Sequence, residues 1–79
     1  MSITVLFFGA TADIAGKKRQ DIDVSEGATA SAVFERLRSV YPRLMHHHLH
    51  ISVNQKFATG DEIIRDGDEL AIFTAVSGG

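Results

Sequence analysis

The sequence contains no cysteine among its 79 residues. This absence excludes a disulfide framework, a thiol nucleophile and any cysteine-based zinc site. Long hydrophobic runs are missing too, since the apolar stretch Val5-Leu6-Phe7-Phe8 is far shorter than a membrane span. Met1-Ser2 leads into a strand-like segment without a basic flank, so we expect no signal peptide. Together these features predict a cytoplasmic protein with no membrane partner.

An excess of basic residues is also missing, because eight Lys and Arg face ten Asp and Glu and the formal net charge is −2. This balance predicts that nucleic acid is not a partner, since phosphate contacts need a basic face. The charges are uneven: a basic cluster comes early (Lys17, Lys18, Arg19), and an acidic one comes late (Asp61, Glu62, Asp66, Asp68, Glu69). The acidic cluster has two interpretations, a solvated surface or a collar near the C-terminus that steers a basic partner.

The chain is short enough that we interpret residues 1–79 as one domain, with one thin core and little room for an enclosed active site. Residues 74–79 are small and carry no capping signal, so we expect a flexible tail there. No Gly-x-Ser-x-Gly elbow or Gly-x-Gly-x-x-Gly fingerprint occurs, and the spacing of Gly9 and Gly16 does not match a phosphate-binding loop. We therefore expect no catalytic apparatus in the side chains of this chain.

Apolar patterning predicts strands at 3–8, 19–24, 51–53, 56–58 and 69–73, and the loop at 9–16 has room for one helical turn at 12–15. One amphipathic helix is expected between Thr29, a suitable N-cap, and Pro42, which ends it; its apolar stripe is Ala30, Val33, Leu37 and Val40. Tight turns are expected at Asn54-Gln55 and Asp66-Gly67-Asp68. This order predicts an α+β fold of the β-grasp, ubiquitin-like type. One main helix crosses one face of a mixed sheet, and the first and last strands lie side by side in parallel.

Four histidines form a conspicuous cluster, namely His46, His47, His48 and His50. In an extended segment, three of them would share one face and offer imidazoles to a transition metal. No acidic residue lies between Arg43 and Asp61 to orient such ligands. We therefore interpret the cluster as an exposed polar loop and expect no metal site.

Strand alternation places Phe8 and Phe73 on the sheet face that the helix does not cover. If the first and last strands are neighbours, these two rings lie together, and Phe57 can join them after the Asn54-Gln55 turn. An exposed apolar cluster indicates a docking surface. The alternative is that the three rings are ordinary core or rim residues.

The sequence ends in Gly78-Gly79. Without Cβ atoms, such a tail can thread a narrow channel in whatever backbone conformation a partner imposes. A carboxylate is a poor electrophile, but ATP can convert it to an acyl adenylate, from which sulfide yields a thiocarboxylate and an amine yields an amide. Either reaction needs a second protein. The alternative is an arbitrary terminus without a role.

Several segments, in this order and spacing, resemble a known family over essentially the whole chain. They are Val5-Leu6-Phe7-Phe8 with the loop to Gly16, the Val53-Asn54-Gln55 turn, Asp66-Gly67-Asp68-Glu69 before an apolar strand, and the ending Val76-Ser77-Gly78-Gly79. The family is the small subunit of molybdopterin synthase, which belongs with the ubiquitin-like sulfur carriers.

The resemblance implies a β-grasp fold and a non-catalytic subunit of a two-component sulfurtransferase with no permanently bound cofactor. A ubiquitin-activator-like enzyme uses ATP to adenylate Gly79, and a sulfur donor protein then supplies the sulfur of a thiocarboxylate. The tail enters the large synthase subunit, where the sulfur passes to a pterin precursor. Gly78 allows passage through the channel, and Phe8, Phe57 and Phe73 dock on the large subunit.

Two departures from the family pattern leave the pathway open. Thr74-Ala75 stand where the family often has two prolines, and Ala12-Asp13 stand where an Arg-Glu pair is common. One alternative is a sulfur carrier of another pathway, such as that of thiamine. A second is a ubiquitin-like modifier joined to lysines through Gly79, and a third is an interaction domain with an inert tail.

Overall fold

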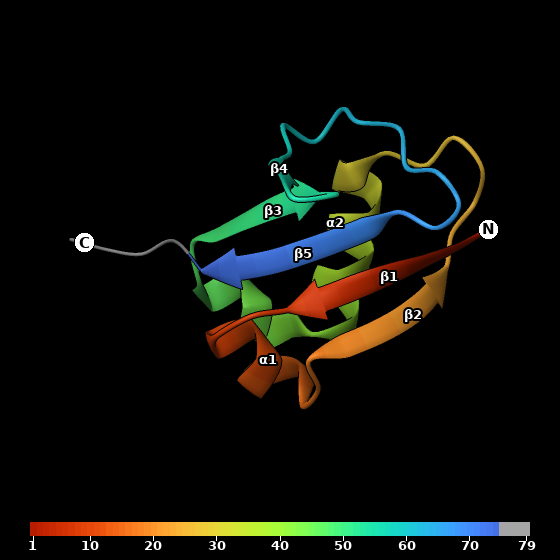
Figure 1. Cartoon of the computed structure of the whole chain (residues 1–79). Coiled ribbons are helices and arrows are strands. Elements are labelled where there is room, and N and C mark those ends of the chain that lie inside the picture. The colour runs from red at the N-terminus through yellow and green to blue at the C-terminus, as the bar shows by residue number, and fades with distance from the viewer. Residues whose placement is uncertain (75–79) are drawn as a thin grey trace.

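A five-stranded sheet forms one layer of the structure, and helix α2 crosses one of its faces as the second layer (Figure 1). The computed structural model describes residues 1–74. The strands are β1 (Ser2–Phe7), β2 (Arg19–Asp23), β3 (Leu49–Val53), β4 (Lys56–Phe57) and β5 (Glu69–Thr74). The helices are α1 (Ala10–Ala15), α2 (Ala30–Val40) and a short 3₁₀ helix, η1 (Pro42–His46). Among residues 1–74, no helix has both the length and the apolar character needed to cross a bilayer.

The strands follow the order β2-β1-β5-β3-β4 across the sheet. Strands β1 and β5 pair in parallel, with Val5 opposite Leu70 and Phe7 opposite Ile72. The other three pairs are antiparallel. The first and last strands therefore lie side by side at the centre, which confirms the predicted β-grasp arrangement.

Helix α2 begins and ends where the sequence predicts. The Thr29 side chain accepts a hydrogen bond from the backbone amide of Ala32 at 3.2 Å, so it caps the first turn. The helix ends at Val40, and Pro42 opens η1, where its missing amide would have had no helical partner. The buried side chains of α2 are Ala30, Val33 and Leu37.

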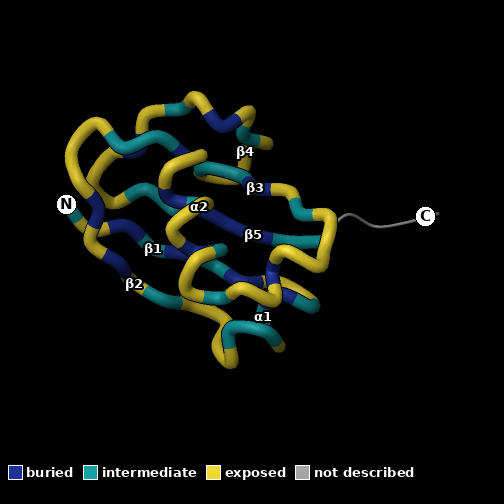
Figure 2. The backbone as a smooth tube through the Cα atoms, turned by 180° about the vertical axis from the view of Figure 1, so that it is seen from behind, coloured by how far each residue is buried: buried dark blue, intermediate teal, exposed yellow. Residues whose placement is uncertain are grey.

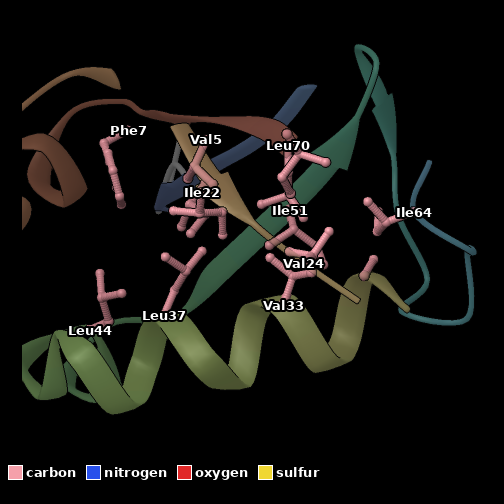
Figure 3. Close-up of a cluster of buried hydrophobic side chains, with 13 residues drawn as sticks. Val5, Phe7, Ile22, Val24, Val33, Leu37, Leu44, Ile51, Ile64 and Leu70 are labelled. Atoms are coloured by element: carbon pink, nitrogen blue, oxygen red, sulfur yellow. The ribbon is translucent and has the colours of Figure 1, made fainter. Parts of the chain in front are cut away.

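The core lies between α2 and the sheet (Figure 3). Strand β1 contributes alternate residues, β5 contributes Leu70 and Ile72, and η1 contributes Leu44; all are nearly or fully buried. The Phe7 ring packs edge-on against Tyr41 with ring centroids 5.8 Å apart. Burial is concentrated along β1 and β5, whereas the connecting loops are mostly exposed (Figure 2).

Several predicted boundaries differ from the structure. Strand β1 ends at Phe7 instead of Phe8, β2 ends at Asp23 instead of Val24, and β3 begins at Leu49 instead of Ile51. The loop after β1 contains a helix of six residues rather than a single turn at 12–15. Strand β4 stops at Phe57 instead of Ala58. Thr74, assigned from sequence to the tail, belongs to β5 because it pairs with Leu49 and continues the ladder. The other residues of the predicted tail, 75–79, lie outside the described residues.

Candidate functional site

The chain leaves the middle of the sheet at Thr74. Because β1 and β5 are parallel, they finish at the same end of the sheet, where Phe7 lies opposite Ile72 (Figure 1). Thr74 pairs with Leu49, the first residue of β3. We call this end of the sheet the exit end. The predicted site residues Gly78 and Gly79 lie outside the described residues, and Gly79 follows Thr74 by five positions in the sequence.

An aromatic patch, formed by His50, Phe57 and Phe73, lies on the open face of the sheet. His50 is directly opposite Phe73 across the β3–β5 pair, and Phe57 is opposite Ser52 across the β3–β4 pair. Ring centroids are 5.8 Å apart for Phe57 and Phe73, 5.8 Å for His50 and Phe73, and 6.0 Å for His50 and Phe57. Phe57 keeps 73% of its surface exposed, so the patch is open to a partner.

Phe8 stands apart from this patch. Its side chain is 52% exposed, and its backbone amide donates to the carbonyl of Ile72 at 3.1 Å. No ring pair joins Phe8 to Phe73 or Phe57 in the part of the chain that the structure describes. The expected ring contact between Phe8 and Phe73 is therefore not present among residues 1–74, and the docking role of Phe8 stays a prediction.

The structure divides the histidine cluster between different elements. His46 ends η1 and His50 lies within β3, so the interpretation of all four as one polar loop is wrong. All four side chains are exposed. His48 contacts His50 edge-on with ring centroids 5.6 Å apart. Among residues 1–74, no group of three or more metal-ligating side chains comes together. The expectation of no metal site stays a prediction.

Sequence reasoning missed His50 as a member of the patch. Its signal was present in the alternation of 49–53, where His50 and Ser52 flank the buried Ile51. Because cross-strand neighbours on an antiparallel pair share a face, any open-face residue opposite Phe73 joins the patch. The pairing partner of Phe73 could not be read from sequence.

Thr11 is the one buried polar residue in the described part of the chain, and sequence reasoning did not single it out. Its hydroxyl lies 2.7 Å from the carbonyl oxygen of Phe8 and 2.9 Å from that of Ile72. It therefore joins α1 to the ends of both central strands, directly before Phe73. The hydroxyl donates its proton to these carbonyls and so helps to hold the exit end in place.

We expect Thr11→Val, which keeps the side-chain shape but removes the hydroxyl, to lower the free energy of unfolding by about 1 kcal/mol. The loss is moderate because the carbonyl of Ile72 keeps the amide of Phe8 as a donor. Denaturant unfolding measures it. Thr4→Val is the matched control: Thr4 bonds Asp21 on the exposed face, so its change should stay within about 0.5 kcal/mol. Equal losses in the two variants would contradict the role given to Thr11.

The late acidic residues close turns at the other end of the sheet. Glu62 accepts from the backbone amides of Thr59 at 2.7 Å and Gly60 at 2.8 Å. The amide of Thr59, followed by those of Glu62 itself and Gly60, holds the pKa of the Glu62 carboxyl below its ordinary value. Asp66 accepts from the amide of Ser2 at 2.8 Å.

Asp68 has a similar role, since it accepts from the amide of Arg65 at 2.8 Å and from the Asn54 side chain at 3.0 Å. These carboxylates therefore lie around the beginning of β5, whereas the chain leaves the sheet at its end. Strand β5 therefore separates Asp66 and Asp68 from Thr74, so these carboxylates do not form an acidic collar at the point where the chain leaves the sheet.

This chain is similar in sequence to one known protein family and to several known proteins. The model of the ThiS family matches residues 5–79. A molybdopterin synthase sulfur carrier subunit from Mycobacterium tuberculosis is 32% identical, over 100% of this chain and 99% of the relative. Small archaeal modifier protein 1 from Haloferax volcanii is 30% identical, over 91% of this chain and 94% of the relative.

Solved structures agree on the fold. The crystal structure of SAMP1 from Haloferax volcanii superposes with a TM-score of 0.85 at 29% identity and covers 100% of both chains. A complex of subunits 1 and 2 of molybdopterin-converting factor from Helicobacter pylori contains a chain with a TM-score of 0.65 at 21% identity, again with 100% of both chains covered. At 21% identity, the similarity to the Helicobacter pylori chain shows a shared fold and nothing about function.

Proposed function

The chain belongs to the ThiS family, and on that basis we propose that it is a sulfur carrier acting as the small, non-catalytic subunit of molybdopterin synthase. One observation carries this proposal. The similarity to a molybdopterin synthase sulfur carrier subunit runs over the whole chain, and the family match continues to Gly79. The matched residues therefore include Gly78 and Gly79 as well as the folded part of the chain.

In the proposed reaction the Gly79 carboxylate attacks the α-phosphorus of ATP on a separate adenylating enzyme, and pyrophosphate leaves. Sulfide released by a donor protein then attacks the acyl carbon, AMP leaves, a proton is lost, and Gly79 carries a thiocarboxylate. In the large subunit this sulfur displaces an oxygen substituent of the pterin precursor, and water hydrolyses the resulting thioester, which leaves the sulfur on the pterin and restores the Gly79 carboxylate. ATP is a substrate of the adenylating enzyme, so this chain needs no resident cofactor. The proposal places these steps in the cytoplasm.

The described fold supports delivery of the tail into a partner. Strand β5 is fixed on both sides, by β1 and β3, up to the exit end. From Thr74, five residues span at most about 18 Å when extended, enough to enter a channel in another protein. Gly78, without a Cβ, would pass a narrow section of that channel.

Docking on the large subunit is proposed for the open face around the exit end. The aromatic patch lies on the β3–β4 side of Thr74, and the exposed Phe8 lies on the β1 side. A partner that covers both sides would aim the tail inward.

A modifier role is the second candidate, favoured by the similarity to small archaeal modifier protein 1. The same activated carboxyl would then react with a lysine amine and form an amide. A sulfur carrier of the thiamine type would form the same thiocarboxylate at Gly79 but would deliver its sulfur to a different acceptor.

Intact-mass analysis of the chain from its native host tests the proposal. We expect a fraction of molecules in which one oxygen is replaced by sulfur, located at Gly79 by fragmentation. A chain that lacks Gly79 is the control and should gain no sulfur at its end. Lysine adducts without any thiocarboxylate would favour the modifier role. Failure of the thiocarboxylated chain to support molybdopterin formation with the large subunit would favour another sulfur pathway.

A further inference from the structure

Basic side chains gather at the exit end, on the β1–β2 side. Lys17 and Lys18 form the turn between α1 and β2, and the carbonyl of Lys18 accepts from the amide of Phe7 at 2.9 Å, so the turn is held beside the end of β1. Arg19 lies opposite Leu6 on the open face. All three are exposed.

These charges are only partly balanced. Within residues 1–74 neither lysine forms an ion pair, while Arg19 lies 3.7 Å from Asp21. Helix α1 contributes one acid, Asp13, and η1, which contacts α1, adds Arg43. The exit end is therefore positive although the whole chain carries a net charge of −2.

The compensating acids lie at the opposite end of the sheet. They lie at the start of β5 and in the loop before it. Glu62, Asp66 and Asp68 accept backbone amides there, and Asp61 and Glu69 add further charge. From Glu69 to Thr74 the strand covers about 17 Å at about 3.3 Å per residue. This distance exceeds the Debye length of about 8 Å at physiological ionic strength. A partner at the exit end therefore responds to the local positive charge rather than to the net charge.

We infer that the part of the receiving surface that faces the turn of Lys17 and Lys18 is acidic, with carboxylates placed to meet both lysines, and that an apolar socket for the aromatic patch lies on the other side of the point where the tail enters. The inference rests on the proposed function and assigns this surface to the large subunit of molybdopterin synthase. An acidic collar near the C-terminus would have required a basic partner surface, whereas these lysines require an acidic one. The two lysines and the patch lie on opposite sides of Thr74, so both contacts together orient the tail.

The test is the association rate with the purified large subunit from the same organism, measured by stopped flow at low and high salt. Lys17→Glu combined with Lys18→Glu should slow association about tenfold at low salt, and the difference should shrink at high salt. Lys18→Glu alone should slow it several-fold. Arg65→Glu is the control, since it makes the same charge change as Lys18→Glu at the acidic end and should change the rate less than about twofold.

Each outcome decides one claim. Equal slowing by Lys18→Glu and Arg65→Glu would show that only net charge matters and would overturn the inference while leaving the proposed function intact. Faster association of the double variant would mean a basic receiving surface and would overturn it as well. If the wild-type chain shows no binding to the large subunit, the proposed function fails and the inference fails with it. Circular dichroism confirms that all variants are folded.

Discussion

Adding one alanine after Gly79 is expected to abolish sulfur transfer. The extension moves the reactive carbon by up to about 3.6 Å, and a misplacement of about 1 Å can cost a hundredfold in rate. It also places a Cβ where the channel is expected to accept glycine. Deleting Gly79 should have the same effect, because the carboxyl then stops short of the reacting group. The assay combines the chain with adenylating enzyme, ATP, sulfur donor and large subunit.

Stability should not change in either variant. Every buried residue in the described part of the chain lies at or before Ile72, and these residues already form one core between α2 and the sheet. Ser77→Ala is the matched control, since it alters the tail but preserves its length and both glycines, and it should transfer sulfur like the wild type. Normal turnover by the extended chain, with intact mass showing the extra alanine still attached, would refute the carrier function.

Phe73→Ala is expected to weaken binding to the large subunit by about 2 kcal/mol or more, which is about 30-fold in Kd. Phe73 contacts both other members of the aromatic patch, His50 and Phe57, so its removal leaves only the contact between those two rings. Calorimetry of the purified proteins measures the change. Phe57→Ala should also weaken binding, because its ring is the most exposed of the patch phenylalanines.

Phe34→Ala is the matched control for this variant. Phe34 is also partly buried, but it lies on α2, where it packs against the core and carries the Arg38 guanidinium 5.6 Å from its ring centroid. Truncating it should lower stability without changing affinity for the large subunit. If Phe34→Ala and Phe73→Ala weaken binding equally, the open face is not the docking surface.

The secondary structure was largely predictable because local signals agree with the tertiary fold. Thr29 caps α2 through its own side chain, Pro42 cannot continue that helix, and the buried stripe has helical spacing. The Asn54-Gln55 turn is confirmed, with φ of 51° and 71°, as a two-residue hairpin of this kind requires. The β-grasp pairing of β1 with β5 followed from element order and from the family resemblance.

Tertiary pairing decided what local patterns leave open. Ala71 alternates with the core residues Leu70 and Ile72 and so lies on the open face, yet it is only 8% exposed, because Leu6 and Ser52 lie beside its small side chain on the neighbouring strands. The burial of Thr11 depends on two carbonyls, and the second, that of Ile72, is 61 positions away in the sequence. The periodicity of apolar residues along the sequence cannot predict a contact between residues so far apart.

The sequence by itself determined the strands, the helix, and a Gly-Gly end suited to an activated carboxyl. Only the tertiary structure decided which side chains surround the point where the chain leaves the sheet. Strand direction is the physical reason. Because β5 runs away from its acidic turn, Asp66 and Asp68 lie one strand length from Thr74, whereas the turn of Lys17 and Lys18, from the first quarter of the chain, lies at the exit end, across β1 from β5.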